Sequence, residues 1–390
     1  MRIFISTGEV SGDLQGTLLV EALQRQAASR GVELEIVALG GEKMHQAGAK
    51  ILGNTSKIGS MGLLEALPYV LPTMRVQRRA LDYLRENPPD VVILIDYMGP
   101  NLSIGAYMRR HLPHVPVFYY IAPQAWAASV RVITAQTTSK VISVSDKLLA
   151  IFPEEEKYYQ KHGADVTWVG HPLIDRMEEF PAREEARTEL GIGGDDLCVA
   201  LLPASRRQEL KYLLPVIFGA AAKIQAQFPQ VKFWIPLSLD VYRDAIAKSI
   251  HRYKLNATIV SGEQQKQVLA AADLALTKCG TVNLELALLK IPQVVLYRVS
   301  PLTYWVAKNI LNISIPFASP PNLVAMRAIV PEFIQTAATV DNITQTAIAL
   351  LTNPTLKAQM QADYQQMRTQ LGEPGVCDRA ATAILEYVQY

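Results

Sequence analysis

Cysteine is scarce in this 390-residue chain, and the few cysteines stand far apart. Cys198, Cys279 and Cys377 are odd in number and widely spaced, which indicates neither a disulfide framework nor a zinc site. These cysteines predict a reducing compartment. We also expect no bound cofactor.

An excess of charge of either sign is also missing. The chain has 38 Lys and Arg against 36 Asp and Glu, for a net charge of +2. Binding to nucleic-acid phosphates usually requires a strongly basic face, so we expect no nucleic-acid partner.

Long hydrophobic runs are absent as well. The most lipid-like stretch, residues 61–72, contains Glu65 and two prolines. It falls short of the roughly 20 apolar residues that a membrane-spanning helix needs. Near the amino terminus, Glu9 comes too early for the apolar region of a secretory signal. We therefore expect a soluble or membrane-surface protein, located in the cytoplasm.

What the chain does have is an alternation of short apolar runs with longer helical patterns. Apolar residues make up 49% of the sequence, enough for a sizeable core, and the length suggests two or three domains. Strands alternating with helices predict an α/β protein with parallel sheets. The first series of predicted strands covers residues 2–6, 36–40, 91–96, 117–121 and 141–145, and the second covers 198–203, 231–236, 257–260, 273–277 and 293–297.

The two series predict two Rossmann-like halves that face a cleft. We place an amino-terminal domain at residues 1–172, a carboxy-terminal domain at 173–365 and a final helix at 366–390. Ligands of open parallel sheets bind beyond the carboxyl ends of the strands, so the polar motifs that follow the predicted strands are the candidate sites.

The first motif, residues 8–16, follows the first strand and contains three glycines. Its spacing does not match a dinucleotide fingerprint. Glu9 and Asp13 would repel a pyrophosphate and instead suit a ligand rich in hydroxyls. We therefore predict that Glu9, Ser11 and Asp13 line a substrate, the alternative being that Ser11 or Asp13 caps a helix.

Two further motifs follow strands of the first half. Asp96 ends an apolar strand, where it is a candidate general base, an anchor for hydroxyls or a turn cap. Gln124 and Trp126 follow the next strand. We predict that they line the cleft, with packing between domains as the alternative.

In the second half, Ser205 and Arg206 stand between a strand and a helix. A guanidinium beside helix N-terminal amides makes a phosphate site, although a capped helix with solvated arginines would leave the same pattern. Gly280 and Thr281 end another strand, and Glu285 follows one helical turn later. A turn for the diphosphate and a carboxylate for the ribose predict a sugar-nucleotide site.

The stretch from 60 to 79 is strongly apolar and ends in three arginines. It suits docking on an anionic membrane surface and contact with acyl chains. The alternative is a buried helix with an ordinary solvated end. The residues predicted to form this membrane patch are Leu63, Leu64, Leu67, Val70, Leu71 and Met74.

Taken in order, these motifs resemble those of the lipid-A-disaccharide synthase family. The matching stretches are 8–13, 61–65, 119–126, 169–173, 201–206, 280–285 and 321–323, followed by Pro331, Glu332 and Gln335. The family consists of inverting glycosyltransferases of the GT-B fold, so the resemblance implies that fold and no metal. It also adds Asn322 to the expected UDP-binding residues.

The resemblance implies a specific reaction. UDP-2,3-diacylglucosamine would donate its sugar to 2,3-diacylglucosamine 1-phosphate (lipid X), giving lipid A disaccharide and UDP. The expected partners are this donor, the lipid acceptor and the inner-membrane surface, with a homodimer left open. The carboxy-terminal half would hold UDP, and the amino-terminal half would hold the acceptor.

The acceptor half departs from the family pattern. Gly99 stands where the family has a second aspartate, which leaves Asp96 as the candidate base and Glu9 or Asp13 as substitutes. Three alternatives therefore stay open beside the synthase: a UDP-sugar epimerase-type enzyme, a transferase with another acceptor, and a homologue that binds UDP-sugar without turnover.

Overall fold

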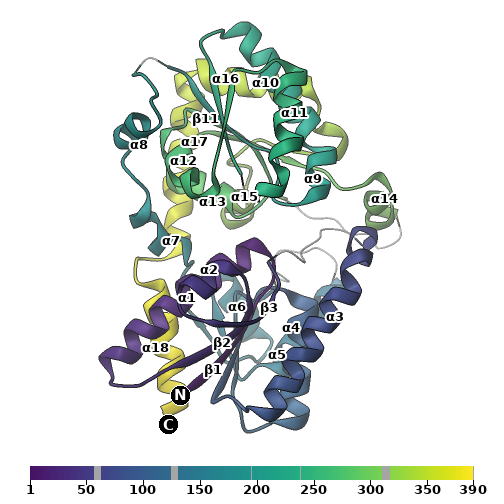
Figure 1. Ribbon diagram of the computed structural model, residues 1–390, viewed down its shortest axis with the longest axis vertical. Coiled ribbons are helices and arrows are strands. Elements are labelled where there is room, and N and C mark those ends of the chain that lie inside the picture. The colour runs from purple at the N-terminus through teal and green to yellow at the C-terminus, as the bar shows by residue number, and fades with distance from the viewer. Residues whose placement is uncertain (57–62, 124–130, 195, 238, 310–316, 390) are drawn as a thin grey trace. The chain divides into compact units, whose positions relative to one another are not determined.

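The computed structural model describes residues 1–56, 63–123, 131–194, 196–237, 239–309 and 317–389. The described residues form two compact α/β units (Figure 1). The first unit holds residues 1–175 together with 371–389, and the second holds 176–309 and 317–370. The chain therefore returns to its first unit after completing the second.

The first unit is built on a seven-stranded parallel sheet. Its strands run in the order β3-β2-β1-β4-β5-β6-β7, so the sequence order reverses between β1 and β4. The strands are β1 (Arg2–Ser6), β2 (Glu35–Gly40), β3 (Lys50–Asn54), β4 (Val91–Ile95), β5 (Val117–Tyr120), β6 (Lys147–Ala150) and β7 (Val166–Trp168).

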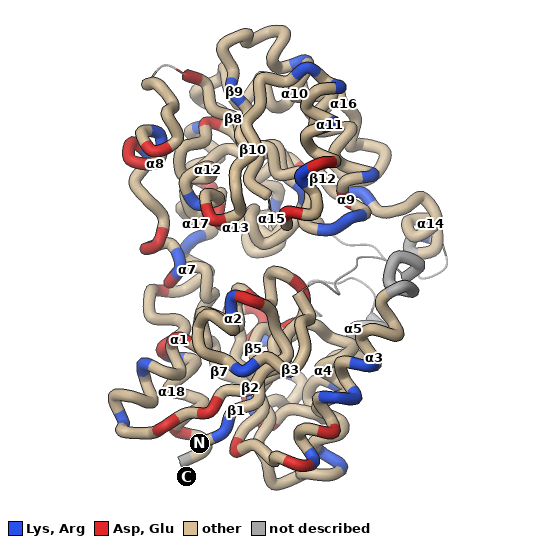
Figure 2. The backbone as a smooth tube through the Cα atoms, in the orientation of Figure 1, with Lys and Arg blue, Asp and Glu red and all other residues tan. Residues whose placement is uncertain are grey.

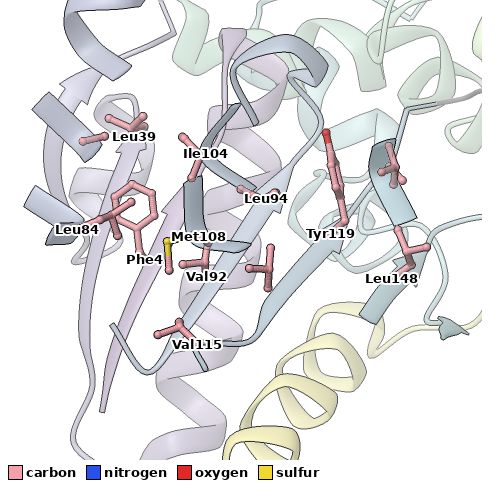
Figure 3. Close-up of a cluster of buried hydrophobic side chains, with 14 of the residues drawn as sticks. Phe4, Leu39, Leu84, Val92, Leu94, Ile104, Met108, Val115, Tyr119 and Leu148 are labelled. Carbon is pink, nitrogen blue, oxygen red and sulfur yellow. The ribbon is translucent and has the colours of Figure 1, made fainter. Parts of the chain in front are cut away.

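Helices cover both faces of this sheet. They are α1 (Glu9–Ser29), α2 (Glu42–Gln46), α3 (Leu63–Glu86), α4 (Met98–His111), α5 (Arg131–Val144), α6 (Pro153–Lys161), α7 (Leu173–Arg176) and α18 (Val376–Gln389). Side chains from α3, α4 and α5 pack on the face that carries Phe4, Val92 and Tyr119 (Figure 3). On the other face, α18 packs along α1, and Tyr387 contacts Phe118 edge to face.

The second unit repeats this architecture with a six-stranded parallel sheet. Its order, β10-β9-β8-β11-β12-β13, reverses between β8 and β11. The strands are β8 (Cys198–Leu202), β9 (Lys232–Pro236), β10 (Ala257–Val260), β11 (Leu274–Lys278), β12 (Gln293–Tyr297) and β13 (Glu332–Ile334).

The helices of the second unit are α8 (Arg183–Glu189), α9 (Arg207–Tyr212), α10 (Leu214–Gln227), α11 (Arg243–Tyr253), α12 (Gln265–Ala271), α13 (Val282–Leu288), α14 (Pro301–Asn309), α15 (Pro320–Ala325), α16 (Val340–Thr352) and α17 (Pro354–Arg368). A buried cluster joins Ala200 of β8 and Ala275 of β11 to the small side chains of α8 and α12. Small residues at this layer let the helices approach the sheet closely.

Most predicted strands are confirmed, because buried parallel strands read as continuous apolar runs. The strand predicted at 141–145 is wrong: α5 runs through Val144, and the strand is β6, Lys147–Ala150. A short β-branched run bounded by polar residues does not separate a buried helix end from a strand. The stretch predicted as a final helix, 366–390, holds the end of α17 and then α18, and α18 belongs to the first unit.

Candidate functional site

The predicted motifs of the first unit gather where the strand order reverses. The neighbouring strands β1 and β4 are parallel, so their carboxyl ends share one edge of the sheet. Glu9 and Ser11 follow β1, and Asp96 follows β4. Such a switch point is where open α/β sheets bind ligands, because the chains leave it in opposite directions and open a crevice.

The Asp96 backbone at this edge is held from two sides. The Asn101 amide donates to the carbonyls of Ile95 at 3.0 Å and Asp96 at 2.8 Å, and Ser6 Oγ donates to Asn101 Oδ1 at 2.7 Å. The buried Tyr119 hydroxyl also donates to the Asp96 carbonyl, at 2.9 Å. The Asp96 residue itself is exposed, so a fixed main chain presents its carboxylate at the surface of the unit.

Backbone strain collects at the same edge. Glu9 (φ 61°), Asp96 (49°), Tyr97 (41°) and Ile121 (60°) have left-handed backbones directly after β1, β4 and β5. Each such residue costs about 1–3 kcal/mol, and structures retain this strain mostly at functional sites. Gly8 relieves crowding here, because a Cβ at that position would lie 2.3 Å from the Tyr97 ring.

Asp13, also predicted at this site, is buried with its carboxylate fully engaged. It accepts hydrogen bonds from the backbone amides of Gly41 at 2.7 Å, Lys43 at 3.2 Å and Met44 at 3.2 Å. These amides begin α2, so Asp13 ties α1 to the start of that helix. Gly41 is required beside it, because a Cβ there would lie 2.5 Å from the Asp13 carboxylate.

The predicted motifs of the second unit gather at its own switch point, beyond β8 and β11. Glu209 accepts hydrogen bonds from the amides of Ser205 at 2.6 Å and Arg206 at 3.0 Å. The Arg206 guanidinium lies 3.2 Å from the other oxygen of Glu209. Sequence reasoning missed Glu209, although its position three residues after a helix N-cap is that of a capping-box acid.

The turn after β11 is closed by its own helix. The Gly280 amide donates to Asn283 Oδ1 at 2.7 Å, and Lys278 Nζ would lie 2.5 Å from a Cβ at position 280. The Cys279 thiol donates to the Ala318 carbonyl at 2.9 Å. Burial raises the pKa of Cys279 to about 12, so this thiol stays neutral. Lys278 adds a cation that the sequence analysis did not assign to the site.

Glu285, the predicted ribose ligand, lies in the interior of the second unit. Its carboxylate pairs with the guanidinium of Arg176, and both side chains are almost fully buried. Gln265 Nε2 also reaches it, at 3.4 Å. Burial lowers the pKa of Arg176, as expected for a desolvated cation. No sequence signal linked Arg176 to this site, because it lies far from Glu285 in the chain.

Asn322, another predicted UDP residue, is a buried residue of α15. Its Oδ1 accepts from the amides of Ile329 at 2.7 Å and Val330 at 2.8 Å, and its Nδ2 lies 3.1 Å from Glu332. Glu332 in turn accepts from the amide of Ser319, which precedes α15. Asn322 therefore holds this segment against the strand edge.

Several predicted residues lie partly or wholly outside the described part of the chain. Gln124 and Trp126 lie outside the described residues, as do the side chains of Leu63, Leu64 and Leu67 at the start of α3. The rest of the predicted membrane patch is strongly exposed, with Val70 at 45%, Leu71 at 64% and Met74 at 58%. Figure 2 marks Lys and Arg in blue along α3, which carries Arg75, Arg78 and Arg79.

Neither a metal-binding cluster nor a membrane-spanning helix is present among the described residues. In that part of the chain, no group of three or more His, Cys, Asp and Glu side chains is arranged to hold a metal ion. None of the described helices is long and apolar enough to cross a membrane.

Two parallel-sheet units, each with polar motifs beyond its switch point, define a protein of the GT-B fold. A solved structure of this fold, the UDP-GlcNAc 2-epimerase from Neisseria meningitidis bound to UDP-GlcNAc, is similar with a TM-score of 0.68 over 100% of both chains. Its sequence identity is 13%, so this likeness concerns the fold alone.

The family follows from the sequence comparisons: residues 3–387 match the lipid-A-disaccharide synthetase family, and the chain belongs to it. A lipid-A-disaccharide synthase from Gloeothece citriformis is 56% identical over 388 residues, covering 100% of both chains. A second, from Synechocystis, is 53% identical and covers 99% of this chain and 98% of the relative. The predicted family and fold class are thus confirmed.

Proposed function

We propose that the protein is an inverting glycosyltransferase that makes lipid A disaccharide. It moves 2,3-diacylglucosamine from UDP to 2,3-diacylglucosamine 1-phosphate and releases UDP. The observation that carries this proposal is the family match over nearly the whole chain, with a relative of that name at 56% identity. The likeness to an epimerase stays at the level of the fold.

The reaction requires a base at the acceptor. The acceptor hydroxyl oxygen attacks the anomeric carbon of the donor sugar, the bond from that carbon to the β-phosphate oxygen breaks, and UDP leaves with the electron pair. The hydroxyl proton passes to a carboxylate, which we assign to Asp96. Its support is an exposed carboxylate on a main chain fixed by Asn101 and Tyr119.

The other two acids of this edge take different parts in the proposal. Glu9 is half-buried on a strained backbone, which suits an orienting contact to sugar hydroxyls together with Ser11. Asp13 already accepts three amide hydrogen bonds, so we assign it to holding the α1–α2 corner that carries Glu9.

We assign binding of the diphosphate to cations of the second unit. The amides of Ser205, Arg206 and Gly280 already donate to side chains of this unit. We therefore assign the departing negative charge mainly to the Arg206 guanidinium and the Lys278 ammonium, with Thr281 at the same turn. Glu209 keeps Arg206 in place until the phosphates compete for it.

The uridine ribose remains assigned to Glu285, and Asn322 is given a supporting role in the same unit. For Glu285 to bind the ribose hydroxyls, its oxygens must be shared between Arg176 and the ligand, since the pair is buried. A carboxylate has about four acceptor positions, so this sharing is chemically feasible. Asn322 acts by holding the residues before β13.

The lipid partners imply a place of action. We propose that the protein works at the cytoplasmic face of the inner membrane, with the apolar start of α3 toward the lipid and its arginines toward anionic headgroups. Gln124 and Trp126 would contact the acceptor.

The test is product analysis with purified protein. UDP-2,3-diacylglucosamine and radiolabelled lipid X are supplied in detergent, and the products are separated by chromatography. We expect one labelled disaccharide for each UDP released, and no UDP release when lipid X is omitted.

Each rival predicts a different outcome. Release of UDP and an altered monosaccharide without acceptor would identify an epimerase-type enzyme. UDP binding without any product would identify a homologue that binds only, and a disaccharide formed solely with another acceptor would identify a different transferase.

A further inference from the structure

The second unit carries a cluster of exposed apolar side chains that the proposed function does not use. Leu302 is 53% exposed, Tyr304 36% and Trp305 54%, and all three lie on α14. Other exposed large apolar residues of this unit, such as Val241 and Leu356, occur singly. A cluster of large exposed apolar residues marks a contact surface more often than scattered ones do.

The α14 helix is exposed along most of its length, and Thr303 is its buried residue. Ser300 begins the helix, since its hydroxyl accepts from the Thr303 amide at 3.2 Å and bonds Thr303 Oγ1 at 2.8 Å. Thr303 is buried, whereas Leu302 and Trp305, three residues apart, share the outer face. Among the described residues, α14 has no extensive packing against another helix or strand, and it lies at the periphery of its unit (Figure 1).

Charge around α14 favours an anionic partner. The chain contains no Asp or Glu from residue 286 to residue 331. Of the basic residues in this stretch, Arg327 pairs with Asp363 and Arg298 donates to the carbonyls of Gln335 and Ala338, so the cation on α14 itself is Lys308. Lys308 is exposed, and its ammonium lies 5.9 Å from the centre of the Tyr304 ring. Trp, Tyr and Leu beside a cation are the composition of helices that lie in the plane of a membrane interface.

We infer that α14 is a second membrane-contact element, located in the second unit and taking an anionic phospholipid surface. Leu302 and Trp305 enter the boundary between headgroups and acyl chains, while Lys308 meets the phosphates. This contact is separate from the predicted patch on α3. It rests on the proposed function only in that lipid substrates bring the protein to a bilayer.

The experiment measures partition of the full chain onto vesicles, with no substrate present. Vesicles of phosphatidylcholine with phosphatidylglycerol are compared with vesicles of phosphatidylcholine alone. The test variant is Leu302→Ser/Trp305→Ser, and the matched control is Val241→Ser/Leu356→Ser, which removes two exposed apolar side chains of the same unit. Leu71→Ser/Met74→Ser probes α3 in parallel.

We expect the test variant to bind mixed vesicles about tenfold more weakly than the wild type, with an unchanged midpoint of thermal unfolding. The control variant should bind as the wild type does. Lys308→Gln should weaken binding to mixed vesicles about fivefold and leave phosphatidylcholine vesicles unaffected. Vesicles should also shift the Trp emission of the wild type to the blue, and this shift should be smaller in Trp305→Phe.

Three results would overturn the inference. The first is equal vesicle binding by the test and control variants. The second is loss of self-association by the test variant with unchanged partition, which would make this face an interface between copies. The third is a raised KM for detergent-dispersed substrate with unchanged partition, which would make α14 an acyl-chain site. Because partition needs no turnover, a failure to form disaccharide would leave this test standing.

Discussion

The carboxyl edges of the two sheets share one topology and differ in how they hold charge. In the first unit, Asp96 stands exposed and Glu9 half-buried on strained backbone. In the second, the cations Arg206 and Arg176 each lie against a buried carboxylate of the same unit, Glu209 and Glu285. An exposed acid suits removal of a proton, whereas the partly exposed Arg206, held in place by Glu209, suits an anionic leaving group.

The two edges also differ in the source of the unfavourable free energy that their structures retain. At the carboxyl edge of the first sheet, Glu9, Asp96, Tyr97 and Ile121 are all left-handed, whereas at the second edge Gln335 is left-handed after β13, so local backbone strain is greater at the first edge. The second keeps buried ion pairs, whose desolvation is repaid only while both partners remain. Substitutions should therefore reduce turnover at the first edge and stability or UDP affinity at the second.

Asp96→Asn should produce the largest effect. Removal of the proton acceptor should lower kcat by about a hundredfold to ten-thousandfold, with the UDP dissociation constant unchanged. Asp82→Asn is the control, since it removes an exposed acid of the same unit that pairs with Arg85 at the surface. Steady-state kinetics and calorimetric titration with UDP make the measurement. Wild-type turnover in Asp96→Asn would remove this residue from the mechanism.

Glu285→Ala should produce the second largest effect, because it leaves the buried Arg176 guanidinium without its carboxylate partner. The free energy of unfolding should fall by about 3–5 kcal/mol, as judged by urea titration. The double variant Arg176→Met/Glu285→Leu removes both charges and should recover most of that stability. If Glu285 binds the ribose, the double variant should bind UDP at least about tenfold more weakly than the wild type, even though its stability is recovered. Wild-type UDP affinity in the double variant would reduce Glu285 to a structural role.

Glu155 offers a test by pH in the first unit. Burial raises its pKa to about 8, although amides of Ile151, Phe152 and Ala122 donate to it and work in the opposite direction. The folded state therefore holds this proton up to a higher pH than the unfolded state does. Stability due to Glu155 is complete at acid pH and is lost as the pH rises from about 4.5 to about 8.

Glu155→Gln should flatten that decline by up to a few kcal/mol when unfolding is measured at the two ends of this range. Glu154→Gln, an exposed neighbour on α6, should leave the decline as it is. His171 works at the other end, since burial lowers its pKa to about 3 and stability is lost as the pH falls below about 6.5. If stability declines between these two pH values as steeply in Glu155→Gln as in the wild type, the Glu155 carboxyl is not the group responsible for the decline.

Lys278→Met should act on UDP affinity alone. Loss of one charged contact to the diphosphate should weaken binding by about tenfold to a hundredfold, with thermal stability close to that of the wild type. Lys290→Met, an exposed lysine of the same unit, is the control. The same UDP affinity in both variants would contradict the role given to Lys278.

Gly99→Asp should have the smallest effect. It tests whether a second carboxylate at the first edge contributes to catalysis. A Cβ at this position meets no atom within 4 Å, and the residue lies in the first turn of α4. Removing a helical glycine and adding an acid near the helix N-terminus should stabilise the protein by roughly 0.5–1 kcal/mol in thermal unfolding. A large gain in turnover would show that a second carboxylate shares the role of base with Asp96.

The local elements of this protein were predictable from particular residues. β1 and β12 match their predicted ranges, because each is a buried apolar run with polar or glycine residues at its ends. The prediction of a strand at 141–145 was wrong, because that short apolar run is the end of a helix, and a helix end can show the same local pattern as a strand. Asp96 and Gly280 were found because each lies within two residues of the end of a strand.

The sequence alone thus determined two parallel sheets and the switch points at which polar motifs collect, because periodicity and strand endings are local properties of the chain. Only the tertiary structure decided which charges meet. Asp13 meets the amides of α2, Glu285 meets Arg176, and α18 packs on α1. These partners come from distant segments, and burial makes their pairing necessary, since an unpaired charge in the interior would cost too much free energy.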